Sequence, residues 1–159
     1  MPVEIGAPAP DFALRDQNNQ EIRLADFRGR KAVLLVFYPL AFTGVCQGEL
    51  GEIQERLPEY ANPAVQVLTV SVDSPYSHKV WAEREGWEFP LLADFWPHGA
   101  VAQAYGVLDA DRGHAERATF LIDAAGVVRY AEVGAPGQAR DQRAWRQAVA
   151  DLEADIRVR

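Results

Sequence analysis

The chain has 159 residues, of which 48% are hydrophobic and 25% charged, a composition that is typical of a folded globular protein and excludes disorder and fibrous repeats. Its formal net charge of −7 argues against a nucleic-acid partner, because phosphate contacts need a clustered excess of Lys and Arg. The single cysteine excludes an intramolecular disulfide framework. We therefore expect one domain, residues 1–159, that folds around its own core.

The sequence contains no pattern of a secreted or membrane protein. Its N-terminal segment lacks the basic stretch followed by an apolar stretch that marks a signal peptide. The longest nonpolar run, residues 32–42, is broken by Pro39 and is too short to span a bilayer. These features predict a cytoplasmic protein with no membrane partner. The basic cluster Arg28–Lys31 is interpreted as a solvated turn without a function.

The N-terminal part of the chain predicts a hairpin followed by a buried strand. Residues 6–14 lead through a polar turn at 16–20 into an alternating run at 21–24. Residues 32–38 form a continuous apolar run of strand length. Such a run is typical of a strand buried on both faces of a largely parallel sheet, so we expect it at the centre.

A helix is predicted directly after this strand and the turn at 39–45. Apolar residues recur at steps of four, three and four, which is the spacing of one helix face, at Cys46, Leu50, Ile53 and Leu57. We expect this helix to end near Pro58, since proline cannot continue a helix interior. A cysteine therefore lies in the first turn of a helix that follows a buried strand.

The rest of the chain continues the alternation of strands and helices. The expected elements are a buried strand at 65–72, a helix at 76–85, short elements at 90–93 and 100–105, strands at 118–122 and 127–133 around the turn Asp123–Gly126, and an amphipathic helix at 140–156. This order predicts an α/β protein of the thioredoxin-like kind, with a central mixed sheet flanked by helices and an N-terminal hairpin extension.

The position of Cys46 decides its chemistry. If Thr43 caps the helix, Cys46 is the third helical residue, where unpaired backbone N–H groups and the helix dipole favour a thiolate. The alternative is a small apolar residue buried on the helix face, which periodicity alone favours. The pattern P-x-x-x-T-x-x-C formed by Pro39, Thr43 and Cys46 favours the reactive thiolate, because the proline shields a cysteine that lies beside a hydroxyl.

At these three residues the sequence resembles the peroxiredoxin family and matches its peroxidatic motif. The resemblance extends through almost the whole chain, with matching segments at 7–12, 37–46, 72–81, 89–94 and 117–120. Gln47 and Gly48 replace the proline that follows the cysteine in many two-cysteine members, whose C-terminal resolving cysteine is also absent. The segments similar to the one-cysteine alkyl hydroperoxide reductase E type are 39–50, 94–99 and 140–145.

The resemblance implies a thiol-dependent peroxidase that acts on hydrogen peroxide and organic hydroperoxides. The Cys46 thiolate would attack the peroxide and become sulfenic acid. Thr43 would hold the thiolate and the incoming oxygen through its hydroxyl, while Pro39 keeps water away from both. Arg117 matches the family's active-site arginine, whose guanidinium fork would donate to sulfur and peroxide together. Without the resemblance, Arg117 is an ordinary surface cation at the start of a strand.

Two further residues match positions near the family's site. Glu49 matches an acidic residue three positions after the cysteine and would orient Arg117. An exposed carboxylate in the first helical turn is the alternative interpretation of Glu49. Trp81 matches an aromatic residue near the site, and we expect it to provide packing.

The presence of a single cysteine determines which partners the protein needs. No second cysteine can resolve its sulfenic acid, so an external reductant is required. The resemblance implies a low-molecular-weight thiol with a glutaredoxin-like protein, or mycoredoxin if the organism makes mycothiol. It also implies a homodimer formed by loops beside the site, for which Phe42 and residues 95–97 could supply an apolar patch. Alternatively, these aromatic residues belong to the monomer core.

Other functions lack the residues that they need. A thiol-disulfide oxidoreductase requires a second cysteine. His78, His98 and His114 form no H-x-x-x-H pair, so a metal site is not expected and surface or structural roles are favoured. No glycine-rich nucleotide motif occurs, and neither flavin nor haem is implied, so we expect no cofactor. A non-enzymatic peroxide sensor or a chaperone on the same fold remains an alternative.

Overall fold

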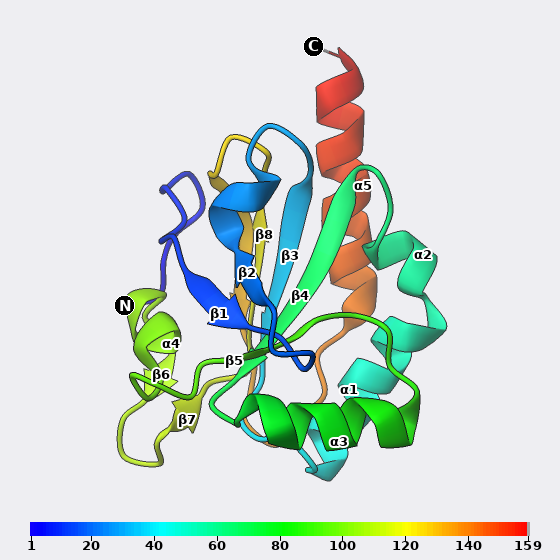
Figure 1. Ribbon diagram of the computed structural model, residues 1–159. Coiled ribbons are helices and arrows are strands. Elements are labelled where there is room, and N and C mark those ends of the chain that lie inside the picture. The colour runs from blue at the N-terminus through cyan, green and yellow to red at the C-terminus, as the bar shows by residue number, and fades with distance from the viewer. Residues whose placement is uncertain (159) are drawn as a thin grey trace.

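The computed structural model describes residues 1–158 and contains a seven-stranded mixed sheet with helices on both faces (Figure 1). The strand order is β2-β1-β5-β4-β3-β8-β9. These strands are β1 Ala13–Arg15, β2 Glu21–Arg23, β3 Ala32–Phe37, β4 Val65–Ser71, β5 Leu91–Ala93, β8 Ala118–Ile122 and β9 Val128–Val133. A separate pair consists of β6 Leu108–Asp109 and β7 His114–Ala115. The helices are η1 Leu24–Phe27, α1 Gly44–Glu55, α2 Leu57–Tyr60, α3 Pro75–Glu85, α4 Ala100–Ala104 and α5 Gln142–Val158.

The central strand is β3, as its apolar run predicts. It pairs in parallel with β4 and antiparallel with β8, and all six of its residues are buried. Successive side chains of a strand point to opposite faces. Leu34 and Val36 accordingly belong to one hydrophobic cluster, while Leu35 and Phe37 belong to the other. This strand therefore links the two halves of the core.

Different helices and chain segments pack against the two faces of the sheet. One cluster includes Leu50 from α1, Trp81 from α3 and Trp145 from α5. The opposite cluster includes Ala102 from α4 and Phe12 from the N-terminal segment. Figure 1 shows α1, α2 and α5 on one side of the sheet and α4 on the other. The arrangement confirms the predicted thioredoxin-like α/β fold.

The carboxyl ends of the two central parallel strands lie side by side, and this position determines the site. Phe37 at the end of β3 pairs with Val70 of β4, and the Tyr38 N–H continues the ladder to the Val70 carbonyl at 3.0 Å. The loop that follows β3 therefore runs beside Ser71 and Asp73, which follow Val70. The N-terminus of α1 begins from this edge.

Most expected elements are present, with ends shifted by one or two residues. The hairpins β1–β2 and β8–β9 are both antiparallel, and Gly126 in the second turn has a φ of 86°. The first long helix ends earlier than expected, at Glu55, and Pro58 lies in the first turn of the separate helix α2. Proline is tolerated there because the first helical N–H groups have no partner within the helix. The pair β6–β7 and the turn η1 were not predicted.

Two smaller expectations also have outcomes. Residues 28–30 are exposed and Lys31 is half-buried, so the basic cluster is the solvated turn that we expected. Within residues 1–158, none of the helices combines the length and the apolar character that crossing a membrane requires.

Candidate active site

The loop between β3 and α1 brings Cys46 to the carboxyl edge of the sheet. Thr43 is the N-cap residue of α1, with an extended backbone at φ −101° and ψ 146°, and Cys46 is the third helical residue as predicted. The first helical hydrogen bond runs from the Gln47 N–H to the Thr43 carbonyl at 2.8 Å. Cys46 is a free thiol with no exposed surface. A thiolate at this position lies at the positive end of the helix dipole.

The Thr43 side chain does not cap the helix. Its hydroxyl donates to the Leu40 carbonyl at 2.7 Å, inside the loop itself. Serine and threonine hydroxyls commonly form such local hydrogen bonds with neighbouring backbone groups in turns. The oxygen of Thr43 keeps its acceptor lone pairs, and rotation about one bond turns its proton away from Leu40.

The backbone of the same loop is strained at Phe42, whose φ is 64°. A bulky residue in this region costs about 1–3 kcal/mol, which surrounding contacts must supply. The Phe42 ring lies 5.5 Å from the Trp81 ring, and the Arg84 guanidinium lies 5.5 Å from the Phe42 centroid. Both partners belong to α3, so this helix holds the loop in place.

Pro39 and Arg117 lie on the wall of one cavity of about 130 Å³, which also includes Val133 and Pro136. Pro39 is half-buried at the start of the loop. The walls contributed by the prolines and Val133 are apolar, and Arg117 provides a cationic group among them. Asp109, Arg112, His114 and Glu116 also line this cavity, so its wall is mixed in polarity, and Cys46 is not one of its lining residues.

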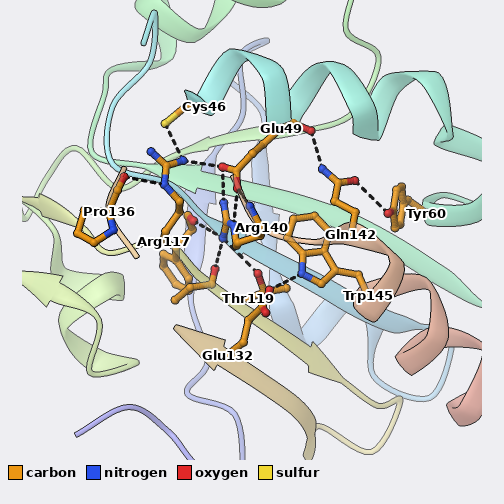
Figure 2. A network of polar contacts seen from close by, with 12 residues as sticks. Cys46, Glu49, Tyr60, Arg117, Thr119, Glu132, Pro136, Arg140, Gln142 and Trp145 are labelled. Carbon is orange, nitrogen blue, oxygen red and sulfur yellow. Dashed lines mark hydrogen bonds and ion pairs between the residues drawn. The ribbon is translucent and has the colours of Figure 1, made fainter. Parts of the chain in front are cut away.

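Arg117 directly contacts the sulfur. Its Nη1 lies 3.3 Å from Cys46 Sγ, and its Nε donates to the Pro136 carbonyl at 3.1 Å (Figure 2). Only 4% of the residue is exposed, so the alternative of an ordinary surface cation is wrong. The chain thus brings together residues 71 positions apart in the sequence.

Glu49 lies one turn after Cys46 and is equally buried, with 2% of its surface exposed. Its Oε1 accepts from Arg117 Nη1 at 2.6 Å, the same nitrogen that contacts the sulfur. The alternative of an exposed first-turn carboxylate is therefore wrong. Residues three apart on a helix share a face, and this face carries both the thiol and the group that holds its cation.

Arg140 completes the site and was not predicted to take part. Its Nε and backbone N–H donate to Glu49 Oε2, both at 2.8 Å, and its Nη2 donates to Glu49 Oε1 at 2.9 Å. Figure 2 shows both arginines converging on this one carboxylate. The remaining nitrogen, Nη1, donates to the Phe37 carbonyl, the Ala118 carbonyl and the Thr119 hydroxyl. Each side-chain nitrogen of Arg140 therefore has at least one acceptor inside the protein.

Two arginines and one carboxylate lie together beside Cys46. Burial alone would raise the pKa of Glu49, but the hydrogen bonds and charge of Arg140, with the charge of Arg117, outweigh it and keep this pKa below its ordinary value. One carboxylate thus faces two guanidinium groups. The buried ion pairs around Glu49 therefore leave one positive charge in excess beside the sulfur.

The start of α5 holds Glu49 from a second direction. Gln142 donates from Nε2 to the Glu49 carbonyl at 2.8 Å and accepts at Oε1 from the Tyr60 hydroxyl at 3.0 Å. The Trp145 ring lies 5.2 Å from the Arg140 guanidinium. Segment 140–145 resembled the family in sequence, and this resemblance was the signal that could have identified Arg140.

Trp81 and the histidines are the remaining residues that the sequence singled out. Trp81 is fully buried and packs against Tyr38 and Trp87, with ring distances of 5.8 and 4.5 Å. It therefore supports the loop between β3 and α1 by packing, as expected. Of the histidines, His78 is buried and structural. The described part of the chain contains no group of three or more His, Cys, Asp or Glu side chains that could hold a metal ion.

Comparison with known proteins agrees with this geometry. Residues 5–131 match the model of the AhpC/TSA family. The chain is 55% identical over 152 residues to alkyl hydroperoxide reductase E of Mycobacterium tuberculosis, a match that covers 96% of this chain and 99% of that protein. It is 43% identical over 137 residues to peroxiredoxin-2 of Rattus norvegicus, covering 80% and 68% of the two chains.

Solved structures have the same fold. The crystal structure of the reduced 2-Cys peroxiredoxin of Plasmodium vivax superposes with a TM-score of 0.87 at 30% identity, covering 98% of this chain and 85% of that chain. Unlike a two-cysteine enzyme, this chain has one cysteine. The chain therefore belongs to the AhpC/TSA family of peroxiredoxins and is a thiol-dependent peroxidase of the one-cysteine type.

Proposed function

We propose that Cys46 is the nucleophile of this peroxidase and that Arg117 is the principal hydrogen-bond donor to the reacting atoms. The observation that carries the proposal is the 3.3 Å contact between Arg117 Nη1 and Cys46 Sγ inside a buried cluster of two arginines and one carboxylate. Glu49 and Arg140 act through Arg117 by fixing its orientation.

The reaction takes place at the sulfur in one displacement. The Cys46 thiolate attacks one peroxide oxygen, so that an S–O bond forms as the O–O bond breaks. The leaving oxygen takes the bonding electron pair and a proton and departs as water or an alcohol, while Cys46 becomes sulfenic acid. Arg117 donates to the oxygen on which charge develops, and the Thr43 hydroxyl supplies a second donor after it turns away from Leu40.

Ionisation of the thiol is the smaller contribution to the rate. An ordinary cysteine is roughly 3% ionised at neutral pH, so complete ionisation raises the thiolate population only about thirtyfold. One well-placed donor to a developing oxyanion is typically worth about 10² to 10³. The position of the Arg117 guanidinium therefore matters more than the thiolate fraction alone.

Recycling needs a thiol from outside the chain. The external thiol attacks the Cys46 sulfenic acid and releases water, and a second thiol then reduces the mixed disulfide. We propose a low-molecular-weight thiol assisted by a glutaredoxin-like or mycoredoxin-like protein. The single cysteine and the similarity to alkyl hydroperoxide reductase E support this choice. Because such recycling needs a reduced thiol pool, we also propose the cytoplasm as its location.

We further propose that residues 1–159 form one domain and that two copies form a dimer. The seven strands of the main sheet extend from residue 13 to residue 133, which supports the single domain. Phe42, Phe95 and Trp96 are exposed by 45%, 52% and 80%, and large apolar side chains at a surface favour association. Sedimentation at several concentrations should show a dimer that Trp96→Glu weakens, whereas the Ile5→Glu variant, which changes another exposed apolar residue, should remain dimeric.

The direct test of the proposed function is peroxide consumption with excess reducing thiol. The wild-type protein should consume many equivalents of peroxide per chain, while Cys46→Ser should consume none and keep its fold by circular dichroism. An active Cys46→Ser protein would exclude Cys46 as the nucleophile. Consumption that stops at one equivalent with every thiol supplied would favour a sensor over an enzyme.

A further inference from the structure

A second polar cluster contacts the loop between β3 and α1. Ala41, in the middle of the loop, is buried, and its backbone N–H donates to Asp73 Oδ2 at 2.8 Å. Asp73 lies beyond the end of β4, 32 residues further along the chain. A buried N–H needs an acceptor, and here a carboxylate from the neighbouring strand end supplies it.

Asp73 is itself held by buried groups. The Ser71 hydroxyl donates to Asp73 Oδ2 at 2.6 Å, and Ser71 Oγ also lies 2.7 Å from His78 Nε2. The Tyr38 hydroxyl lies 3.3 Å from the same His78 nitrogen. The contacts therefore form a ring that leaves the loop at the Tyr38 side chain and returns to it at the Ala41 N–H.

Three members of this ring are fully buried, and Asp73 is half-buried. Ser71, His78 and Tyr38 each have essentially no exposed surface. Burial lowers the pKa of His78 to about 4, against the opposing charge of Asp73, so the imidazole is neutral near pH 7. Burial likewise raises the pKa of Tyr38 well above its ordinary value. Asp73 provides the only carboxyl group of the ring, and its Oδ2 accepts from both the Ala41 N–H and the Ser71 hydroxyl.

The ring lies where it can control the position of the reacting groups. Pro39 lies between Tyr38 and Ala41 in the sequence, and Thr43 follows two residues after Ala41. The loop then enters α1, in which Cys46 is the third residue. Movement of the loop at Ala41 shifts the Thr43 hydroxyl and the first helical N–H groups relative to the sulfur. A displacement of about 1 Å in such groups has a large effect on the rate.

We propose that Asp73 is a positioning residue of the peroxidase, which fixes the Cys46 loop through the Ala41 N–H, and that Ser71 and His78 fix Asp73 in turn. This inference rests on the proposed role of Cys46. It assigns a role to the segment 72–81, which matched the family in sequence but has no part in the contacts around Arg117. Because Cys46 is fully buried, the same anchor keeps the thiol inaccessible to bulkier reagents.

Two measurements on reduced protein distinguish positioning from a general loss of folded structure. The first is the stopped-flow rate of oxidation by hydrogen peroxide, and the second is the rate of Cys46 alkylation by iodoacetamide. Asp73→Ala should slow the first by about tenfold or more and accelerate the second, because the loop is released. Partial unfolding would lower the peroxide rate only in proportion to the folded fraction, which circular dichroism measures.

Three further variants complete the test. Asp73→Asn can still accept from Ala41 and contact Ser71, so its peroxide rate should lie within about threefold of wild type. Ser71→Ala opens the ring but keeps Asp73, so it should slow peroxide oxidation by less than Asp73→Ala does. Asp123→Ala is the matched control, since Asp123, like Asp73, is a half-buried carboxylate that accepts from backbone N–H groups, here those of Ala125 and Val127 in the turn between β8 and β9. It should alter neither rate.

The outcomes are separable. A peroxide rate of Asp73→Ala within about twofold of wild type would overturn the proposal. A rate of Asp73→Asn as low as that of Asp73→Ala would also overturn it, because contact rather than charge is the proposed cause. If wild-type protein itself fails to react with peroxide, the proposed role of Cys46 is wrong, and this result is distinct from any difference among the Asp73 variants.

Discussion

Arg140 donates hydrogen bonds to both carboxylate oxygens of Glu49, with Nε 2.8 Å from Oε2 and Nη2 2.9 Å from Oε1. This two-point contact fixes the plane of the carboxylate, as a single hydrogen bond would not. The Oε1 atom is then directed at Arg117 Nη1, which lies 2.6 Å away and also contacts Cys46. The orientation of the guanidinium that contacts Cys46 is thus set by a second arginine, Arg140, through Glu49.

Substitution of Arg140 should slow peroxide reduction without removing any direct contact to Cys46. Arg140→Lys keeps the charge but loses the fork, so Glu49 and Arg117 lose their fixed orientation and the stopped-flow rate should fall by about tenfold or more. Arg140→Ala leaves a buried carboxylate underpaired and should lower the free energy of unfolding by about 3–5 kcal/mol. Arg143→Lys, at an exposed arginine paired with Asp141, is the control and should change neither quantity measurably.

Substitution of Arg117 should have the largest effect after that of Cys46. Arg117→Ala removes the donor to sulfur and to the leaving oxygen, so the second-order rate constant for peroxide should fall by far more than about tenfold. Arg117→Lys should recover only part of the loss, since a point charge cannot donate to both atoms from one plane. Arg56→Ala, an exposed arginine paired with Glu59, provides the comparison. A rate within about twofold of wild type for Arg117→Ala would remove Arg117 from the site.

The hydroxyl of Thr43 can be tested by a pair of substitutions at that position. Thr43→Ser retains the hydroxyl and should keep a rate near that of wild type. Thr43→Val preserves the shape but removes the donor, so it should slow peroxide reduction by about tenfold or more. If stopped-flow rates of the two variants are equal, the hydroxyl has no part in the reaction and only its contact with Leu40 matters.

Acid should destabilise the protein through His78. Its pKa falls from an ordinary 6.5 to about 4 in the folded state, mainly because of burial. Between these values the unfolded chain binds a proton that the folded chain does not, so stability is lost as pH falls from 6.5 to 4, by up to about 3 kcal/mol. Urea unfolding across this range should show a smaller loss for His78→Gln. The lowered pKa of Glu49 also makes the free energy of unfolding depend on pH, but it does so in both proteins. If this free energy changes with pH by the same amount in both, His78 is not the cause of the acid sensitivity.

Features with a local sequence pattern were predictable. The run at 32–38 predicted a doubly buried strand, because alternate faces of β3 both enter the core. The spacing of apolar residues placed Cys46 in the first turn of a helix, where the structure has it. Glu49 shares that helix face, so its proximity to the thiol follows from helical geometry. These predictions depend on neighbours within a few residues.

Features that depend on distant contacts were not predictable from the residues alone. Arg140 lies 91 residues from Glu49, and a basic residue before a helix looks the same in the sequence whether its partner is a carboxylate or water. The hydroxyl of Thr43 was expected at the thiolate and instead satisfies Leu40, a choice set by the exact turn of the loop. The strands β6 and β7 have two residues each, too few to produce a periodic pattern.

The distance along the chain between Glu49 and Arg140 also has a consequence for protein synthesis. A ribosome completes Cys46 and Glu49 long before it reaches the two arginines, so a nascent chain carries a cysteine without its charge partners. Such a cysteine has the slow chemistry of any free thiol. We therefore expect reactivity toward peroxide only after the C-terminal segment has docked, and a fragment that ends before residue 140 should be a poor scavenger even where its sheet has formed.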